Sequence, residues 1–202
     1  MSRDVIVIGA GGHGIVVADA ALCAGDRVLG FLDDHATAPV AGLPILGGVA
    51  DYVRFPHAAF VVAIGNAAAR RQVAERLDGV NWHTVIHPTA VISSREVAVG
   101  EGTVILAGAI VNPGAQIGHH CIINTAAVVE HDDRIGNFAH VSVGARLAGT
   151  VSVGDNTWVG IGAVISNNVS VCDNCTLGAG AVVVRDIDRP GTYVGVPARK
   201  LR

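Results

Sequence analysis

The sequence predicts a chain of two parts: a half-Rossmann-like α/β domain over residues 1–86, and an all-β parallel β-helix of hexapeptide repeats over residues 87–202. Two observations support this division. Near the N-terminus, short apolar runs end in glycine-rich turns and alternate with segments of helical composition. Further along, aliphatic side chains return at every sixth position, a period that neither a helix nor an open sheet has.

Composition limits the classes of function. Half of the 202 residues are hydrophobic and 4% are aromatic, so the core must be built from Ala, Val, Ile and Leu, and a disordered or collagen-like chain is excluded. With a net charge of -3 and no basic block before the extreme C-terminus, we expect a small-molecule substrate and no nucleic acid. No apolar run reaches the roughly 18 residues of a membrane span, so we expect a cytoplasmic protein.

The first domain is expected to hold a small parallel sheet. Three apolar, β-branched runs predict strands over 4–8, 28–32 and 59–64. Helices are expected over 15–24 and 66–77. The charged residues of the second helix are expected on its solvent-facing side: Arg70, Arg71, Glu75 and Arg76. Strands that alternate with helices in this way predict parallel pairing.

A glycine turn from Gly9 to Gly14 leads from the first strand into a helix. Its unpaired N–H groups and the positive end of the helix dipole suit a phosphate. Asp33 lies 19 residues beyond Gly14, about where a dinucleotide fingerprint places its ribose-binding acid. Only one mononucleotide-binding half fits before the pattern changes, so a nucleotide-sugar site is favoured over a whole NAD site or purely structural turns. The expected substrate-binding residues are Gly11, Gly12, His13, Asp33, Asp34, Gly65 and Asn66.

Two columns of side chains with a period of six define the second part. The bulky column holds an aliphatic residue at every sixth position from Val99 to Val183, and the small column lies two residues before it. Asp133 is the only member of the small column that is neither small nor β-branched. Glycine follows the bulky column at positions 100, 118, 136 and 154. This spacing of 18 residues is one full coil of a triangular solenoid.

Four cysteines are too few for a disulfide scaffold in a chain of this length. Cys172 and Cys175 have the spacing of a redox or metal pair, but Cys175 belongs to the small column. We therefore interpret this C-x-x-C spacing as a by-product of the repeat. Apart from the run around His131, no cluster has metal-ligand spacing, so no metal is expected.

The run Glu130-His131-Asp132-Asp133 contains the candidate catalytic group. A neighbouring carboxylate can orient an imidazole and raise its basicity. One coil onward from His131 lies Gly149, whose missing side chain would leave a slot beside the histidine. The alternative is a solvent-exposed histidine among acids at a corner of the coil.

The other histidines have less support from the pattern. His87 precedes a proline between the two parts and is interpreted as a structural turn residue. Surface or loop positions are expected for His35, His57, His83, His119 and His120.

Several motifs are spread in order over the chain: the GAGGHG turn at 9–14, Asp33-Asp34, His87-Pro88-Thr89-Ala90, Glu130-His131-Asp132, His140-Val141-Ser142-Val143-Gly144 and Gly195-Val196-Pro197-Ala198-Arg199. Together they resemble the sugar acetyltransferases of the left-handed β-helix superfamily. The nearest members are the nucleotide-activated 4-amino-sugar N-acetyltransferases of the bacillosamine and perosamine type. This resemblance implies a left-handed solenoid and homotrimers with active sites between subunits.

The resemblance also implies roles for single residues. The residue at His131 would be the general base, Asp132 would raise its basicity, and Gly149 would offer its N–H to the thioester oxygen. Acetyl-CoA would be the co-substrate. The positions expected to contact it are His140, Gly149, Ile161, Ala179, Arg199 and Lys200, with Arg202 in the same basic tail. A structural role for His140 and a solvated tail are the alternatives.

The expected function is transfer of an acetyl group from acetyl-CoA to the 4-amino group of a nucleotide-linked deoxyamino sugar in surface-glycan biosynthesis. The nearest alternative is an O-acetyltransferase acting on a sialic-acid-like sugar, because a hydroxyl acceptor would need the same base. The alternative from another class is a non-catalytic trimeric scaffold that binds sugar nucleotides. The break in the repeat around His131 argues against the scaffold.

Overall fold

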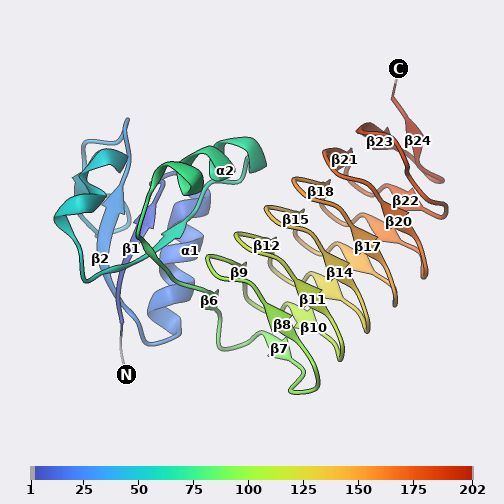
Figure 1. Cartoon of the computed structure of the whole chain (residues 1–202), viewed down its shortest axis with the longest axis horizontal. Helices are drawn as coiled ribbons and strands as arrows, with labels where there is room; N and C mark the ends of the chain where they lie inside the picture. Colours follow the sequence, from blue (N-terminus) through green and yellow to red (C-terminus); the bar gives the residue numbers. More distant parts are fainter. Residues whose placement is uncertain (1–2, 202) are drawn as a thin grey trace.

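The computed structural model describes residues 3–201 and confirms an α/β part followed by a parallel β-solenoid (Figure 1). The α/β part lies beside the first coils of the solenoid, and the coils then stack in sequence toward the C-terminus (Figure 1). Within residues 3–201, no helix has the length and apolar character needed to cross a bilayer.

The α/β part contains a five-stranded parallel sheet in the order β3-β2-β1-β4-β5. Its elements are β1 (Asp4–Ile8), α1 (Gly12–Cys23), β2 (Arg27–Leu32), β3 (Ile45–Gly47), the 3-10 helix η1 (Val49–Arg54), β4 (Ala59–Val62), α2 (Ala67–Arg76) and β5 (Asn81–Trp82). All expected strands and helices are present. The sequence did not predict β3, η1 and β5, because such short runs carry little periodic signal. The turns that follow β1, β2 and β4 share one edge of the sheet.

The solenoid has three sheets, one for each side of the coil. The eight-stranded sheet holds β6 (Val85–Ile86), β9 (Val104–Ile105), β12 (Ile122–Ile123), β15 (His140–Val141), β18 (Trp158–Val159), β21 (Cys175–Leu177), β23 (Gly191–Val194) and β24 (Arg199–Lys200). The six-stranded sheet holds β7 (Val91–Ile92), β10 (Ile110–Val111), β13 (Val128–Val129), β16 (Arg146–Leu147), β19 (Val164–Ile165) and β22 (Val182–Val183). The five-stranded sheet holds β8 (Ala98–Val99), β11 (Gln116–Ile117), β14 (Arg134–Ile135), β17 (Ser152–Val153) and β20 (Ser170–Val171).

Neighbouring coils stack in an 18-residue register. Ile122 pairs with His140, and His140 pairs with Trp158. Both predicted columns face the interior, where the bulky residues from Ile105 to Val183 and the small residues from Ala109 to Ala181 form one core. The period of the sequence is therefore the period of the fold. Strand β6 lies before the expected boundary at residue 87 yet already pairs with β9, and the boundary itself stays a prediction.

Arg70 was expected on the solvent-facing side of α2, and this expectation is wrong. Its side chain is 1% exposed, because that face of α2 packs against the solenoid. The guanidinium donates to the carbonyl oxygens of His120 (2.8 Å) and Phe138 in the solenoid, and to those of Ile64 and Gly65 before α2. A buried cation with four backbone acceptors fixes the α/β part to the solenoid.

Two histidines expected at the surface are also buried. His83 lies 2.7 Å from the Asp26 carboxylate through its Nε2. The ring of His120 stacks on Phe138 with centroids 5.1 Å apart, and burial lowers the pKa of His120 to about 4. His120 lies where the α/β part meets the solenoid, whereas His83 is buried against the α/β part, and such tertiary contacts leave no periodic trace in the sequence. His87 accepts a bond from the Thr89 N–H, as a turn residue would.

Candidate active site

His131 lies at an open corner of the solenoid, in the turn between β13 and β14. Its Nδ1 is 2.9 Å from the Asp132 carboxylate, and 59% of its side chain is exposed. The carboxylate therefore favours the tautomer with the proton on Nδ1, which leaves Nε2 with a free lone pair. An imidazole in this arrangement can accept a proton at Nε2.

Gly149 lies one coil beyond His131, as the repeat predicted. The Thr150 N–H donates to the His131 carbonyl at 2.9 Å, which holds the two corners in register. A Cβ at Gly149 would overlap the ring of His131 at Nε2 and Cε1. Within residues 3–201 the Gly149 N–H has no acceptor, so a free donor lies next to the basic nitrogen.

The charges around His131 favour its protonated form. The hydrogen bond to Asp132 raises the pKa of His131, loss of solvent opposes this rise, and the charges of Asp132, Glu130 and Asp133 add to it. Glu130 is fixed by the Asn112 amide at 2.7 Å and by the His131 N–H at 2.8 Å. The sequence analysis missed Asn112, although it lies one coil before Glu130.

A cavity of about 510 Å³ opens beside this corner. His131 and Asp132 form one wall, and Arg95, Pro113 and Gly114 from the earlier coils are among the residues of the other. Gly114 is needed there because a side chain at this position, which has a φ of +77°, would meet the Asp132 carboxylate. The histidine thus faces an open space and not a packed core.

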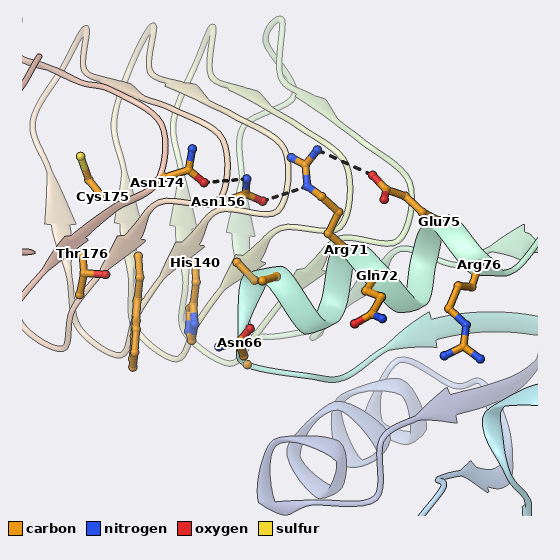
Figure 2. Close-up of a pocket in the computed structure, with 14 residues that line it drawn as sticks. Asn66, Arg71, Gln72, Glu75, Arg76, His140, Asn156, Asn174, Cys175 and Thr176 are labelled. Carbon is orange, nitrogen blue, oxygen red and sulfur yellow. Dashed lines mark hydrogen bonds and ion pairs between the residues drawn. The ribbon is translucent and has the colours of Figure 1, made fainter. Parts of the chain in front are cut away.

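A larger groove of about 810 Å³ lies between α2 and the solenoid (Figure 2). Gly65 and Asn66 line it at the start of α2, and His140 lines it from the solenoid. Figure 2 shows Asn156 between Arg71 and Asn174, to both of which it is hydrogen-bonded. The other lining residues include Gln72, Glu75, Arg76, Trp158, Cys175 and Thr176. The sequence analysis missed this solenoid wall, since outward-facing positions carry no regular pattern.

His140 has the opposite electrostatic setting to His131. It is buried, its Nε2 lies 3.0 Å from the Asn124 amide, and its ring stacks on Trp158 with centroids 5.8 Å apart. Burial, with the nearby charge of Arg70, lowers the pKa of His140 to about 3. The ring of His13 lies 6.3 Å away, and burial lowers its pKa to about 4. Both histidines are therefore neutral at physiological pH.

The two acids expected to bind the nucleotide, Asp33 and Asp34, accept hydrogen bonds from backbone N–H groups. The Asp33 carboxylate accepts the N–H groups of Ala10, His35 and Ala36, and these bonds lower its pKa although burial acts to raise it. Asp34 accepts the Val49 N–H at 2.7 Å. Both carboxylates therefore hold the backbone turns at this edge of the sheet in place. Gly11 and Gly12 border open space, since a Cβ there would meet no atom within 4 Å.

The expected acetyl-CoA positions lie elsewhere on the solenoid. Ile161 and Ala179 are exposed at another corner, 18 residues apart, and the Gly180 N–H donates to the Ile161 carbonyl. Arg199 and Lys200 lie on β24, where the Lys200 ammonium donates to the Pro190 carbonyl. Arg202 lies outside the described residues. One chain therefore brings together His131, Asp132 and Gly149, and separately His13, Gly65, Asn66 and His140.

Two segments of the chain match models of known protein families. Residues 4–77 match the PglD N-terminal domain, and residues 150–185 match the bacterial transferase hexapeptide (six repeats). The acetyltransferase domain of PglB from Neisseria gonorrhoeae is 38% identical, with a TM-score of 0.95 over 99% of this chain and 100% of that one. The chain belongs to the hexapeptide-repeat sugar N-acetyltransferases.

Two further relatives are N-acetyltransferases that are named for an amino-sugar substrate. The perosamine N-acetyltransferase PerB from Caulobacter crescentus, solved with CoA and GDP-perosamine, is 36% identical, with a TM-score of 0.93 over 98% of this chain and 97% of that one. The UDP-N-acetylbacillosamine N-acetyltransferase of Bacillus subtilis is 40% identical over 114 residues. That match covers 52% of each chain, so it spans about half of the curated relative.

The thiols of this family member fit structural roles. Cys172 and Cys175 are free, with their Sγ atoms 3.6 Å apart. Burial raises the pKa of Cys175 to about 12, and does the same for Cys121. Among residues 3–201, no three His, Cys, Asp or Glu side chains form a metal-binding group.

Gly149→Ala tests the slot beside His131. The added methyl group would push the imidazole away from its position over the next coil, and a misplacement of about 1 Å can cost on the order of a hundredfold in rate. We expect turnover to fall by about ten- to a hundredfold and the NMR signals of His131 to shift. Wild-type turnover with a shifted His131 signal would show that the position of this ring does not matter.

Asp132→Asn tests the electrostatics of the pair. Because the hydrogen bond to Asp132 is the main cause of the raised pKa of His131, removing the charge should lower that pKa. The acidic limb of the kcat/KM profile should then move to lower pH. Asp173→Asn, an exposed carboxylate in a later coil, is the control and should leave the limb in place. An unmoved limb in Asp132→Asn would contradict the assignment.

Proposed function

We propose that the protein transfers an acetyl group from acetyl-CoA to the 4-amino group of a nucleotide-linked deoxyamino sugar. The observation that carries this proposal is the His131–Asp132 pair lying against Gly149 at an open corner. The relatives that match nearly the whole chain include named N-acetyltransferases, which supports an amine acceptor over the hydroxyl of a sialic-acid-like sugar. A scaffold without catalysis would have no use for this pair. An acetyl-CoA-dependent reaction also fits the expected cytoplasmic location.

In the proposed reaction the sugar amine attacks the carbonyl carbon of the thioester. A C–N bond forms, and the Gly149 N–H donates to the oxygen that becomes negative. His131 accepts the amine proton at Nε2, while Asp132 stabilises the imidazolium. Collapse of the tetrahedral intermediate breaks the C–S bond, and the departing thiolate takes the proton from His131. No acetylated enzyme is needed, and the raised pKa values of Cys121 and Cys175 disfavour thiolates at neutral pH.

The groove beside α2 is proposed to hold the nucleotide sugar. Asn66 caps α2 by accepting the Ala69 N–H, and the other N–H groups of the first turn suit a pyrophosphate. The half-exposed face of Trp158 offers a stacking surface. The neutral imidazole of His140 lies between the two. The exposed corner of Ile161 and Ala179 would carry the pantetheine arm of acetyl-CoA toward Arg199 and Lys200.

The groove and the His131 corner lie on different sides of one chain, since His140 is on the eight-stranded sheet and His131 lies between the other two. We therefore propose a homotrimer in which the His131 corner of one subunit completes the groove of its neighbour. The six-stranded sheet has an apolar outer column that such packing would bury. It consists of Val91, Ile110, Val128, Val164 and Val182, with Arg146 between Val128 and Val164.

His131→Ala tests the proposed function. A positioned general base contributes about a hundred- to ten-thousandfold, so turnover measured as release of CoA thiol should fall by this factor. Acetyl-CoA should still bind, because its contacts are spread over several coils. The assay needs a panel of UDP-, dTDP- and GDP-linked 4-amino sugars. If the variant keeps more than about a tenth of the wild-type rate on a sugar that the wild type uses, the base is another group.

Subunit mixing tests the shared site. Gly65→Tyr places a ring in the groove, and the backbone there accepts a side chain without a clash. We expect this variant and His131→Ala to be inactive alone. In mixed trimers about a quarter of the sites combine an intact groove with an intact base, so activity should return to roughly that fraction. If each site is built within one subunit, mixing restores nothing.

A further inference from the structure

Asp133 is a buried acid in a column of small apolar side chains. Its exposure is 0%, and its neighbours one coil earlier and later in the same column are Ala115 and Val151. Burial raises the pKa of the Asp133 carboxyl to about 7. An alanine or valine here would pack without this electrostatic cost, so packing does not account for the residue.

The carboxylate accepts two backbone N–H groups, one through each oxygen. Glu130 N–H donates to Oδ2 at 2.8 Å, and Val151 N–H donates to Oδ1 at 2.7 Å. The first donor begins the turn that holds His131, and the second ends the turn that holds Gly149. One buried side chain therefore contacts both of these turns.

Because the Glu130 N–H donates to Asp133, it does not take part in the ladder of hydrogen bonds between coils. At every sixth position from Gly100 to Ser166, the residue after the strand donates to a carbonyl of the next coil, and Glu130 is the exception. Consistent with this, β13 pairs with β16 only through Val128 and Arg146, whereas the other neighbouring coils pair at two or more residues. The ladder is interrupted at the His131 corner.

The bond to Asp133 prevents the Val151 N–H from closing the turn that contains Gly149. In neighbouring turns the small-column residue closes its own turn, as Ala145 does by donating to Ser142 and Ala163 by donating to Gly160. Val151 donates to Asp133 of the earlier coil and leaves the Ala148 carbonyl without this bond. The turn that carries Gly149 is thus held by the coil of His131.

We propose that Asp133 is a positioning residue that sets the distance and orientation between His131 and Gly149. It removes one bond that would draw the two coils together at this corner and supplies another that fixes the Gly149 turn from inside the solenoid. The imidazole of His131 lies in the space between them. This inference rests on the proposed function, because it takes His131 as the base and the Gly149 N–H as the oxyanion donor.

Asp133→Ala tests the inference. Alanine is the commonest residue of the small column, so we expect the variant to fold and to keep its melting temperature, while Glu130 and Val151 return to the ordinary bonds of the repeat. Turnover should fall by about a hundredfold, as expected for a misplacement of about 1 Å. The KM for acetyl-CoA should change little, and the acidic limb of the kcat profile should move because His131 is displaced. Asp133→Asn keeps one acceptor oxygen, so its turnover should lie between that of the wild type and that of Asp133→Ala.

Thr103→Ala is the matched control. Thr103 is also a buried polar member of the small column, and its Oγ accepts the N–H of Cys121 in the next coil at 2.9 Å, but at a different corner. This variant should keep wild-type turnover. If Asp133→Ala stays within about twofold of wild type while His131→Ala is inactive, the positioning role is wrong and the proposed function stands. If both are active, the proposed function fails. If Asp133→Ala does not fold, Asp133→Asn decides by the same comparison.

Discussion

The ladder of hydrogen bonds between coils is the constraint on which the rest of the structure depends. From Ala98 to Val183 it places each strand residue over the one 18 positions earlier. Gly149 lies over His131, Val151 over Asp133 and Glu130 over Asn112. Each of these pairs is a contact of the candidate site. The contacts of the candidate site therefore join residues 18 positions apart on neighbouring coils, and no long loop is needed to bring them together.

The same scaffold gives two histidines opposite properties. His131 is exposed beside carboxylates, which raise its pKa, whereas His140 is buried near the Arg70 guanidinium, which helps to lower its pKa. One ring is suited to exchange a proton at physiological pH and the other to remain neutral. Arg70 also has a structural role, since it ties the loop before α2 to two successive solenoid turns, which contain His120 and Phe138.

Much of this could be predicted from the sequence, because a period of six is a local pattern that one chain displays in full. It predicted the coil length, both core columns and the slot at Gly149. The contacts between the two parts could not be predicted. Arg70 has the spacing of a solvent-facing helix residue, and His83 and His120 have no pattern at all, yet all three are buried where segments distant in sequence meet.

The site residues likewise divide into features that the sequence pattern displays and contacts that only the structure shows. The break at Asp133 was visible in the sequence, but its two N–H partners required the fold. Asp33 follows its strand as a ribose-binding acid would, and only the structure shows its oxygens bonded to three backbone N–H groups. Trp158 and Asn156 face outward from the solenoid, where the repeat places no restriction on residue type, so the solenoid wall of the groove gave no signal.

We have proposed that acetyl transfer takes place at the His131 corner. A crystal structure of the protein with coenzyme A and a nucleotide-linked 4-amino sugar tests it most directly. We expect the thiol sulfur and the sugar amine to meet beside the Gly149 N–H, with the amine about 3 Å from Nε2 of a His131. A thiol bound in the groove next to Trp158, with every His131 corner facing only solvent, would contradict it.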